Sequence, residues 1–289
     1  MDNFVHLNIH TEYSLLEGAC RLPALAEAVH SLGQPAAAIT DSGALYGAVD
    51  FSEECKKRGV KPIIGCEVWV ADGSRLSHRH GDKPTRLTLL CMNNDGYKNL
   101  CRLVSDASVA GFDDVPRCDE DTLRRYSEGI IALSGFPDGE AARLLSRRDN
   151  AAALRAAEKY AQIFPGRFYL EMQNHGTDTE QLLCGRLRSL SVETGIPLCP
   201  TNDVHYISRA DSRTQRVLSC IGKNRLLSDP DPDALPTEEY YLKSRSEMRR
   251  YFSDEELDVT LSIAEKCNVD FEFGVTKLPL FTAEGVSDN

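Results

Sequence analysis

The unit that decides the fold class spans Ala36–Val70 and reads AAAITDSGALYGAVDFSEECKKRGVKPIIGCEVWV. It opens with a short apolar run, Ala36–Asp41, which ends in an acid and predicts a buried strand. Leu45–Arg58 has the apolar spacing of a helix, and Gly59 stands where a helix usually stops. Lys61–Val70 is a second apolar strand. A strand, a helix and a strand in this order predict two neighbouring strands of a parallel sheet.

The same alternation runs along most of the chain. Seven segments are predicted as strands: Phe4–His10, Ala36–Asp41, Lys61–Val70, Thr85–Met92, Gly129–Gly135, Arg167–Gln173 and Pro197–Asp203. Helices are predicted at Leu22–Leu32, Leu45–Arg58, Tyr97–Ser108, Glu140–Arg148, Ala151–Phe164, Thr179–Thr194, Arg209–Ile221 and Ser253–Asn268. Because the strands are short, apolar and evenly distributed, we predict an α/β fold in which they close into a seven-stranded (βα)7 TIM-like barrel.

The composition is that of a globular protein, and it argues against some functional classes. The 289 residues are 42% hydrophobic and 27% charged, with a net charge of −11. A protein that grips duplex DNA alone usually presents a basic face, so this chain is a poor candidate for an autonomous DNA clamp. No segment reaches the roughly 20 apolar residues of a membrane span, and the N-terminus lacks the layout of a signal peptide. The ten cysteines form no CxxC pair, so we expect reduced thiols in a cytoplasmic protein with no membrane partner.

The end of the chain differs from the rest. Ser253–Asn268 predicts a helix that opens with a serine cap and has acids in its first turn. The following sequence, TKLPLFTAEGVSDN, loses all periodicity. We therefore expect one barrel domain over residues 1–275 and a linker over residues 276–289.

Polar residues gather where several predicted strands end. In parallel α/β folds these carboxyl ends lie at one face of the sheet, where sites are built. Imidazoles and carboxylates brought together there would suit zinc, manganese or iron, and two such ions could activate a water for phosphoryl transfer. The candidate metal ligands are His10, Glu17, Glu67, Asp203 and His205.

Several motifs together resemble one family. They are HLNIHTEYSLLEGA at His6–Ala19, AITDSGALYG at Ala38–Gly47, KPIIGCE at Lys61–Glu67 and TNDVHY at Thr201–Tyr206, with further matches at NNDGYKNLCRLVS, EGIIALSG and YYLKSRSEM. In this order and spacing they resemble the PHP (polymerase and histidinol phosphatase) domain of bacterial DNA polymerase III alpha subunits. The resemblance covers essentially the whole chain. It implies a distorted seven-stranded barrel, the PHP fold, whose mouth in complete members holds a trinuclear metal site of about nine ligands.

The resemblance also implies that the metal site is incomplete here. His10, Glu17, Glu67, Asp203 and His205 match ligand positions, with Glu17 in place of the usual aspartate. Four other ligand positions are occupied by Asn8, Ser42, Arg86 and Phe136. Asparagine and serine weaken a metal site, and phenylalanine fills volume and excludes water.

Arg86 is the most consequential of these replacements. A guanidinium stays protonated and cannot coordinate a cation. We predict that Arg86 replaces a metal ion electrostatically by pairing with Glu67, Asp203 or Glu17. The five remaining candidates could still hold one divalent ion, zinc or manganese.

Three functions are compatible with the sequence. The first is a non-catalytic scaffold that supports the polymerase palm and thumb domains of a longer chain, docks a separate proofreading exonuclease subunit and meets DNA only indirectly. The second is a metal-dependent phosphoesterase or 3′–5′ exonuclease with a reduced metal set. The third, a free-standing hydrolase of a small phosphate ester, is disfavoured because the motifs match the polymerase branch. A nucleotidyltransferase site would lie in a palm domain beyond Asn289. Between the first two functions, the four lost metal ligands favour the scaffold.

Two basic tracts are predicted to be structural. Arg143, Arg147 and Arg148 follow an Ala/Leu pattern and are expected to form a solvated helix face, with a contact to DNA or another polymerase domain as the alternative. His78 and His80, in the polar stretch SHRHGD, are expected to lie in a solvated loop rather than in a metal site.

Overall fold

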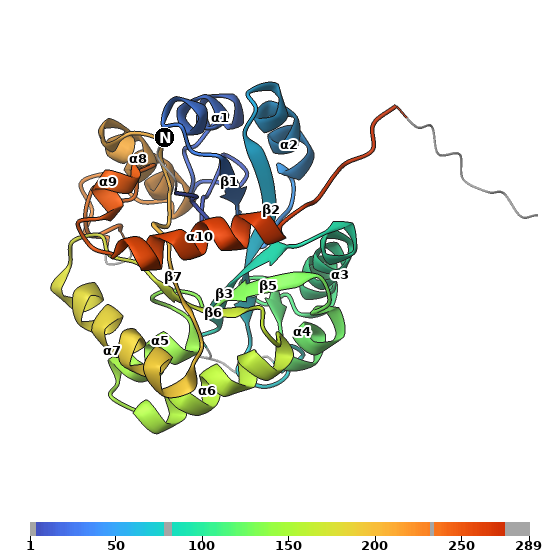
Figure 1. The fold of residues 1–289 in the computed structure, drawn as a ribbon. Coiled ribbons are helices and arrows are strands. Elements are labelled where there is room, and N and C mark those ends of the chain that lie inside the picture. Colours follow the sequence, from blue (N-terminus) through green and yellow to red (C-terminus); the bar gives the residue numbers. More distant parts are fainter. Residues whose placement is uncertain (1–3, 78–82, 232–233, 275–289) are drawn as a thin grey trace, which may run out of the picture.

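A computed structural model describes residues 4–77, 83–231 and 234–274 of the chain. The predicted linker over residues 276–289 lies outside these ranges, and so do His78 and His80. The described residues form one curled sheet surrounded by helices (Figure 1).

The sheet confirms the predicted barrel architecture and corrects one of its details. Its strands are β1 Ala36–Ile39, β2 Lys61–Val70, β3 Thr85–Cys91, β4 Arg117–Cys118, β5 Ile130–Leu133, β6 Phe168–Met172 and β7 Leu198–Pro200. The order is β1-β2-β3-β5-β6-β7, and β4 pairs with β2. The pairs β1–β2, β5–β6 and β6–β7 are parallel, but β3 is antiparallel to both β2 and β5. The expectation of an all-parallel (βα)7 sheet was therefore wrong at β3. The stretch between β2 and β3 has no apolar helical pattern, and an antiparallel connection needs no crossover helix.

The N-terminal segment joins the two ends of this sheet without forming a named strand of its own. Its parallel bridges connect His6 with Ala37 of β1, and Ile9 with Val204 beyond β7. The backbone N–H of His10 donates to the carbonyl of Val204 at 2.7 Å. The predicted strand Phe4–His10 is thus an extended segment that completes the ring through isolated bridges.

Helices surround this ring. They are α1 Leu22–Ser31, α2 Ala48–Lys57, α3 Asn94–Ala110, α4 Glu120–Tyr126, α5 Glu140–Ser146, α6 Asn150–Ile163, α7 Asp178–Thr194, α8 Ser212–Gly222, α9 Arg245–Met248 and α10 Asp254–Lys266, with a short 3-10 turn at Arg209–Asp211. All predicted helices are present, with ends shifted by a few residues. The short elements β4, α4 and α9 were not predicted. Among the described residues, no helix combines the length and apolar character that a membrane crossing requires.

Helix α10 closes one end of the barrel. In Figure 1 it crosses the face of the ring of strands. Its Ile263 and Ala264, and Cys267 just after it, are buried in one cluster with residues of β1, β2, β3, β5, β6 and β7. Lys61 Nζ at the start of β2 donates to the carbonyl of Ala264 at 2.7 Å. The apolar plug at this end leaves the opposite end of the barrel for polar groups.

The barrel interior changes from apolar to polar along its axis because alternate residues of a strand face the same side. On β3 the sequence Leu90, Thr88, Arg86 runs from the apolar plug to the opposite mouth. Leu90 is in the cluster with α10, Thr88 hydrogen-bonds Glu171 of β6, and Arg86 lines an open cavity. The same alternation on the other strands builds an apolar layer, a polar layer and a charged mouth.

Candidate metal centre

Three of the five predicted ligands converge at the mouth of the barrel. His10 follows the N-terminal segment, and Asp203 and His205 follow β7. Their ligand atoms all lie within 4.8 Å of one another. The Nε2 atoms of His10 and His205 lie 3.2 Å and 3.0 Å from the same carboxylate oxygen, Oδ1 of Asp203. The two imidazole rings are stacked, with centroids 4.5 Å apart.

Each histidine is oriented from behind through its other ring nitrogen. Nδ1 of His10 lies 3.1 Å from the hydroxyl of Ser14, which itself donates to Asp41 Oδ1 at 2.7 Å. Nδ1 of His205 lies 3.3 Å from the carbonyl of Glu17. Because an Nδ1 that donates leaves the Nε2 lone pair free, both rings can present Nε2 as a ligand.

The electrostatics of the cluster favour a cation between these groups. Burial alone would lower the pKa of His10, but the carboxylates of Asp203, Glu67 and Glu17 raise it to about 9. Burial also opposes ionisation of Asp203, yet the two imidazoles hold the pKa of this carboxyl well below its usual range. Nε2 of His10 is buried and has no hydrogen bond of good geometry to any described residue, although it lies near Asp203. Asp203 also has a left-handed backbone (φ 46°), a costly conformation that is concentrated at functional sites.

Glu67 does not join this cluster because it is paired with Arg86. Nη1 of Arg86 donates to Oε1 of Glu67 at 2.5 Å, and the Glu67 side chain is only 6% exposed. The predicted pairing of Arg86 with an acid of the site is therefore present, and Glu67 is the partner. The Glu67 carboxylate raises the pKa of Arg86 above its already high value. The guanidinium also lies over the ring of Trp69, 5.8 Å from its centroid.

The remaining predicted positions lie around the same mouth. Glu17, Glu67, Arg86, Phe136, Asp203 and His205 line one open cavity of about 1040 Å³. The hydroxyl of Ser42 donates to Glu17 Oε2 at 2.8 Å, so this carboxylate is held by a side chain where the resemblance implies a histidine ligand. Phe136 is 5% exposed and contributes apolar surface to the wall.

Asn8 is turned away from the metal cluster, toward a buried acid that sequence reasoning missed. Glu171 of β6 is fully buried and accepts hydrogen bonds from Asn8, Thr88, Thr201, Gln173 and the backbone of Gly135. Burial raises the pKa of Glu171 to about 7, although its hydrogen bonds oppose this shift. The sequence carries one signal for this network, because Glu171 lies in the middle of the otherwise apolar strand RFYLEMQ and a buried acid needs hydrogen-bond partners.

The donor set fits one divalent ion. Two imidazole nitrogens and a carboxylate oxygen form the three-ligand pattern of a zinc site that keeps one position open, and manganese accepts the same donors. Glu17 and Glu67 lie outside this group of ligand atoms. Asp203 and His205 also line the open cavity of the mouth.

Comparison with known proteins identifies relatives of nearly the whole chain. The DNA polymerase III subunit alpha of Treponema pallidum is 40% identical over 285 residues, which cover 96% of this chain and 24% of the relative. The corresponding protein of Thermus aquaticus is 38% identical, with the same coverage of both chains. The chain thus spans about a quarter of the length of these relatives. Among solved structures, an amidohydrolase from Chromobacterium violaceum is 13% identical with a TM-score of 0.44, covering 70% of this chain and 87% of that one.

A family model matches more than half of the chain. The family described as the PHP domain matches residues 6–175, which is more than half of the chain. This range contains the N-terminal segment with His10, the β2–β3 pair with Glu67 and Arg86, and the strands up to β6. The chain belongs to the PHP domain family.

Proposed function

We propose that this chain is the PHP domain of a bacterial replicative DNA polymerase III alpha subunit and serves DNA replication in the cytoplasm as a non-catalytic scaffold. Relatives about four times longer than the chain support the placement within a larger polymerase. In that setting the barrel supports the palm and thumb domains of the same polypeptide. A separate proofreading exonuclease subunit would dock on it, and DNA would be met only through these partners.

The observation that carries the proposal is the ion pair between Arg86 and Glu67. Metal-dependent phosphoryl transfer commonly uses two ions, which hold the attacking and leaving oxygens. Here the guanidinium of Arg86 lies in the charged mouth and pairs with the Glu67 carboxylate, which is then not available as a metal ligand. It repels a second cation and cannot itself coordinate one. The site is thereby reduced to the three donors of His10, Asp203 and His205.

These three residues would hold a single divalent ion, zinc or manganese. When bound, such an ion could lower the pKa of a coordinated water. The residues of the chain contribute mainly rigidity: Asp41 fixes Ser14, Ser14 orients His10, and the Glu17 carbonyl orients His205. In the scaffold this ion would tie the N-terminal segment to the segment after β7.

A second candidate function is a phosphoesterase or 3′–5′ exonuclease that works with this one metal. It is favoured by the position of Asp203 and His205 in the lining of the open cavity, where a substrate could reach them. The distinction between the two candidates is whether a bound ion performs chemistry.

The test combines metal content with nuclease activity. The chain, purified without a His-tag, is incubated with zinc or manganese, desalted and examined by elemental analysis. We expect about one equivalent in the wild type and in His30→Gln, an exposed histidine on α1, and little in Asp203→Asn/His205→Gln. Arg86→His, which returns an imidazole to the mouth, should increase the metal content.

Activity is measured as release of nucleotides from single-stranded DNA with manganese present. The scaffold predicts no release above the Asp203→Asn/His205→Gln background. Release that depends on metal and disappears in this variant would refute the scaffold and establish the second candidate.

A further inference from the structure

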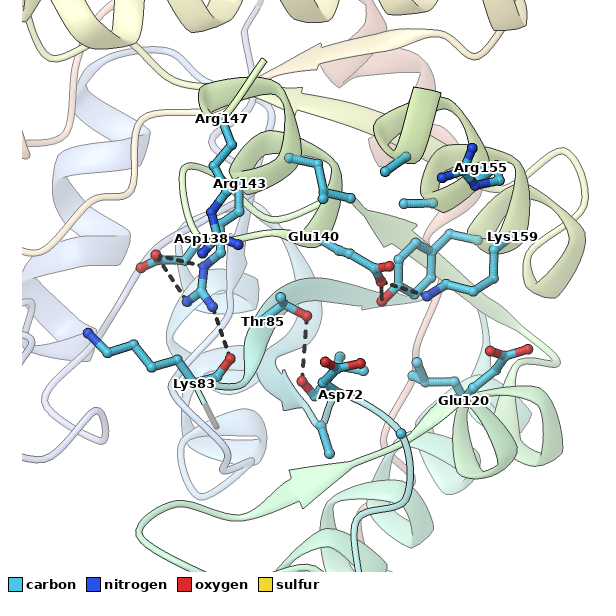
Figure 2. A pocket seen from close by; sticks show the side chains of 18 residues that line it. Asp72, Lys83, Thr85, Glu120, Asp138, Glu140, Arg143, Arg147, Arg155 and Lys159 are labelled. Atoms are coloured by element: carbon cyan, nitrogen blue, oxygen red, sulfur yellow. Dashed lines mark hydrogen bonds and ion pairs between the residues drawn. The ribbon is translucent and has the colours of Figure 1, made fainter. Parts of the chain in front are cut away.

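We propose that a second pocket, between α5, α6 and the end of β2, binds a small phosphate monoester that carries an apolar group. The pocket has a volume of about 900 Å³, and Figure 2 shows the side chains around it. We call it the α5–α6 pocket. Its basic lining residues are Lys83, Arg143, Arg147, Arg155 and Lys159. This inference does not depend on the function proposed above, because it uses none of the metal-site residues.

The charges around the pocket leave a local positive excess. Four acids also line it, and three of them are neutralised. Asp138 pairs with Arg143 at 3.2 Å, and Glu140 pairs with Lys159 at 2.6 Å. The third, Glu120, pairs at 2.7 Å with Arg124, which lies outside the lining.

Three cations remain without such compensation. Lys83, Arg147 and Arg155 are exposed, and the structure gives their charged groups no ion pair within the described part of the chain. Only Asp72 remains among the lining acids to offset them. In a chain of net charge −11, three uncompensated cations around one hollow form an anion-binding environment.

The cations are spread around the pocket rather than along one helix. Arg147 caps the C-terminal end of α5, Arg155 belongs to α6 and Lys83 precedes β3. In Figure 2, Arg143 and Arg147 lie on one side of the pocket and Arg155 and Lys159 on another. The predicted solvated face of Arg143, Arg147 and Arg148 therefore divides, because the first two line the pocket and Arg148 does not.

Four apolar side chains lie among the polar residues of the lining. Val70 ends β2, Leu123 belongs to α4, Leu144 to α5 and Ala156 to α6, and all four line the pocket. Guanidinium groups match phosphate oxygens with paired hydrogen bonds, and the apolar side chains of the lining can contact an attached ring or chain. The volume lies within the roughly 300–1,000 Å³ of sites for small ligands. A mononucleotide has this combination of phosphate and planar apolar surface.

The test measures binding of dAMP to the 289-residue chain by isothermal titration calorimetry. EDTA is present throughout, so that phosphate cannot bind through a metal at the His10, Asp203 and His205 cluster. We expect saturable binding that weakens about tenfold or more in Arg147→Glu/Arg155→Glu, because two of the three uncompensated cations become anions. The matched control is Arg102→Glu/Arg148→Glu, which makes the same charge change at exposed positions outside the pocket and should keep wild-type affinity.

Two further probes, inorganic phosphate and a single-stranded oligonucleotide, identify the source of the phosphate. If inorganic phosphate binds as tightly as dAMP, and the pocket variant loses both, the site holds the phosphate group alone and the proposal of a monoester with an apolar group is wrong. If dAMP binds more tightly than inorganic phosphate, the apolar side chains of the lining contribute to the affinity and the ligand is a monoester. Three further results would overturn the proposal: no binding of dAMP or inorganic phosphate, equal binding by the pocket variant, or binding only of a single-stranded oligonucleotide. The metal-content test is unaffected by any of these outcomes.

Discussion

Arg86 provides the sharpest prediction at the scale of single residues. Its guanidinium is the partner of a Glu67 side chain that is only 6% exposed. Removing it in Arg86→Ala leaves a nearly buried carboxylate beside Asp203 and Glu17. We expect the free energy of unfolding to fall by about 1–3 kcal/mol, because an uncompensated buried charge is costly and Arg86 itself is partly exposed. Urea denaturation of the metal-free chain measures this change.

A double variant separates the effect of charge on stability from the effect of packing. Glu67→Gln/Arg86→Ala removes the carboxylate charge as well and should recover much of the lost stability. If Arg86→Ala unfolds at the same urea concentration as the wild type, the guanidinium does not stabilise the acids of the mouth. The idea that it replaces a metal ion would then be wrong.

Glu171 predicts a pH dependence of stability. Burial raises the pKa of this acid to about 7, above the value of 4.5 expected for an exposed glutamate. Between these values the folded protein binds a proton that the unfolded chain releases, so stability is lost as pH rises through this window. The effect is on the order of 3 kcal/mol at most, since each pKa unit corresponds to about 1.4 kcal/mol. Above the folded pKa the loss is complete and the curve flattens.

The measurement compares wild type with Glu171→Gln by urea denaturation from pH 5 to pH 8. The amide disturbs the hydrogen bonds from Gly135 and Thr88, so the variant is expected to start less stable at low pH. The difference between the two proteins should shrink as pH rises. A difference that stays constant, or grows, would show that Glu171 is already ionised throughout this range.

At the scale of elements, α10 acts as the plug of the barrel. Ile263 is fully buried among strand residues at the end opposite the candidate metal centre. Ile263→Ala should lower the free energy of unfolding by about 2–5 kcal/mol, because the cavity lies in a closed layer that cannot collapse easily. The control is Ser262→Ala on the exposed side of the same helix, which should change stability by less than about 0.5 kcal/mol. Comparable losses in both variants would mean that α10 is not part of the barrel core.

The elements that the sequence predicts well are those with a long periodic pattern. Helix α10 was expected from Ser253 onward, and the capping box between Ser253 and Glu256 is present. Strand β4 has two residues and α9 has four, so neither carries a period long enough to recognise. The antiparallel direction of β3 could not be predicted from the sequence pattern either. Alternation shows which residues face inward, and it is the same for a parallel and an antiparallel strand.

At the scale of the whole molecule, the sequence predicted which residues belong to the candidate site but not which of them contact one another. Strand-end residues and family motifs pointed to His10, Asp203 and His205, and these come together. That Arg86 binds Glu67, and not Asp203 or Glu17, depends on the register of the neighbouring antiparallel strands β2 and β3. Alternation along one strand does not fix which residues of the next strand lie opposite, so the sequence left the acid partner of Arg86 open.

The net charge gives the last prediction, which concerns DNA. A chain of −11 should not hold duplex DNA alone, because affinity for the backbone comes from cations that neutralise phosphates. Fluorescence anisotropy with a labelled duplex of about 20 base pairs should show no saturable binding near physiological salt. The positive excess of the α5–α6 pocket is confined to a hollow of about 900 Å³ and offers no extended basic face. Saturable binding that weakens steeply with added salt would mean that DNA contacts the barrel directly, and the indirect role proposed for DNA would have to be abandoned.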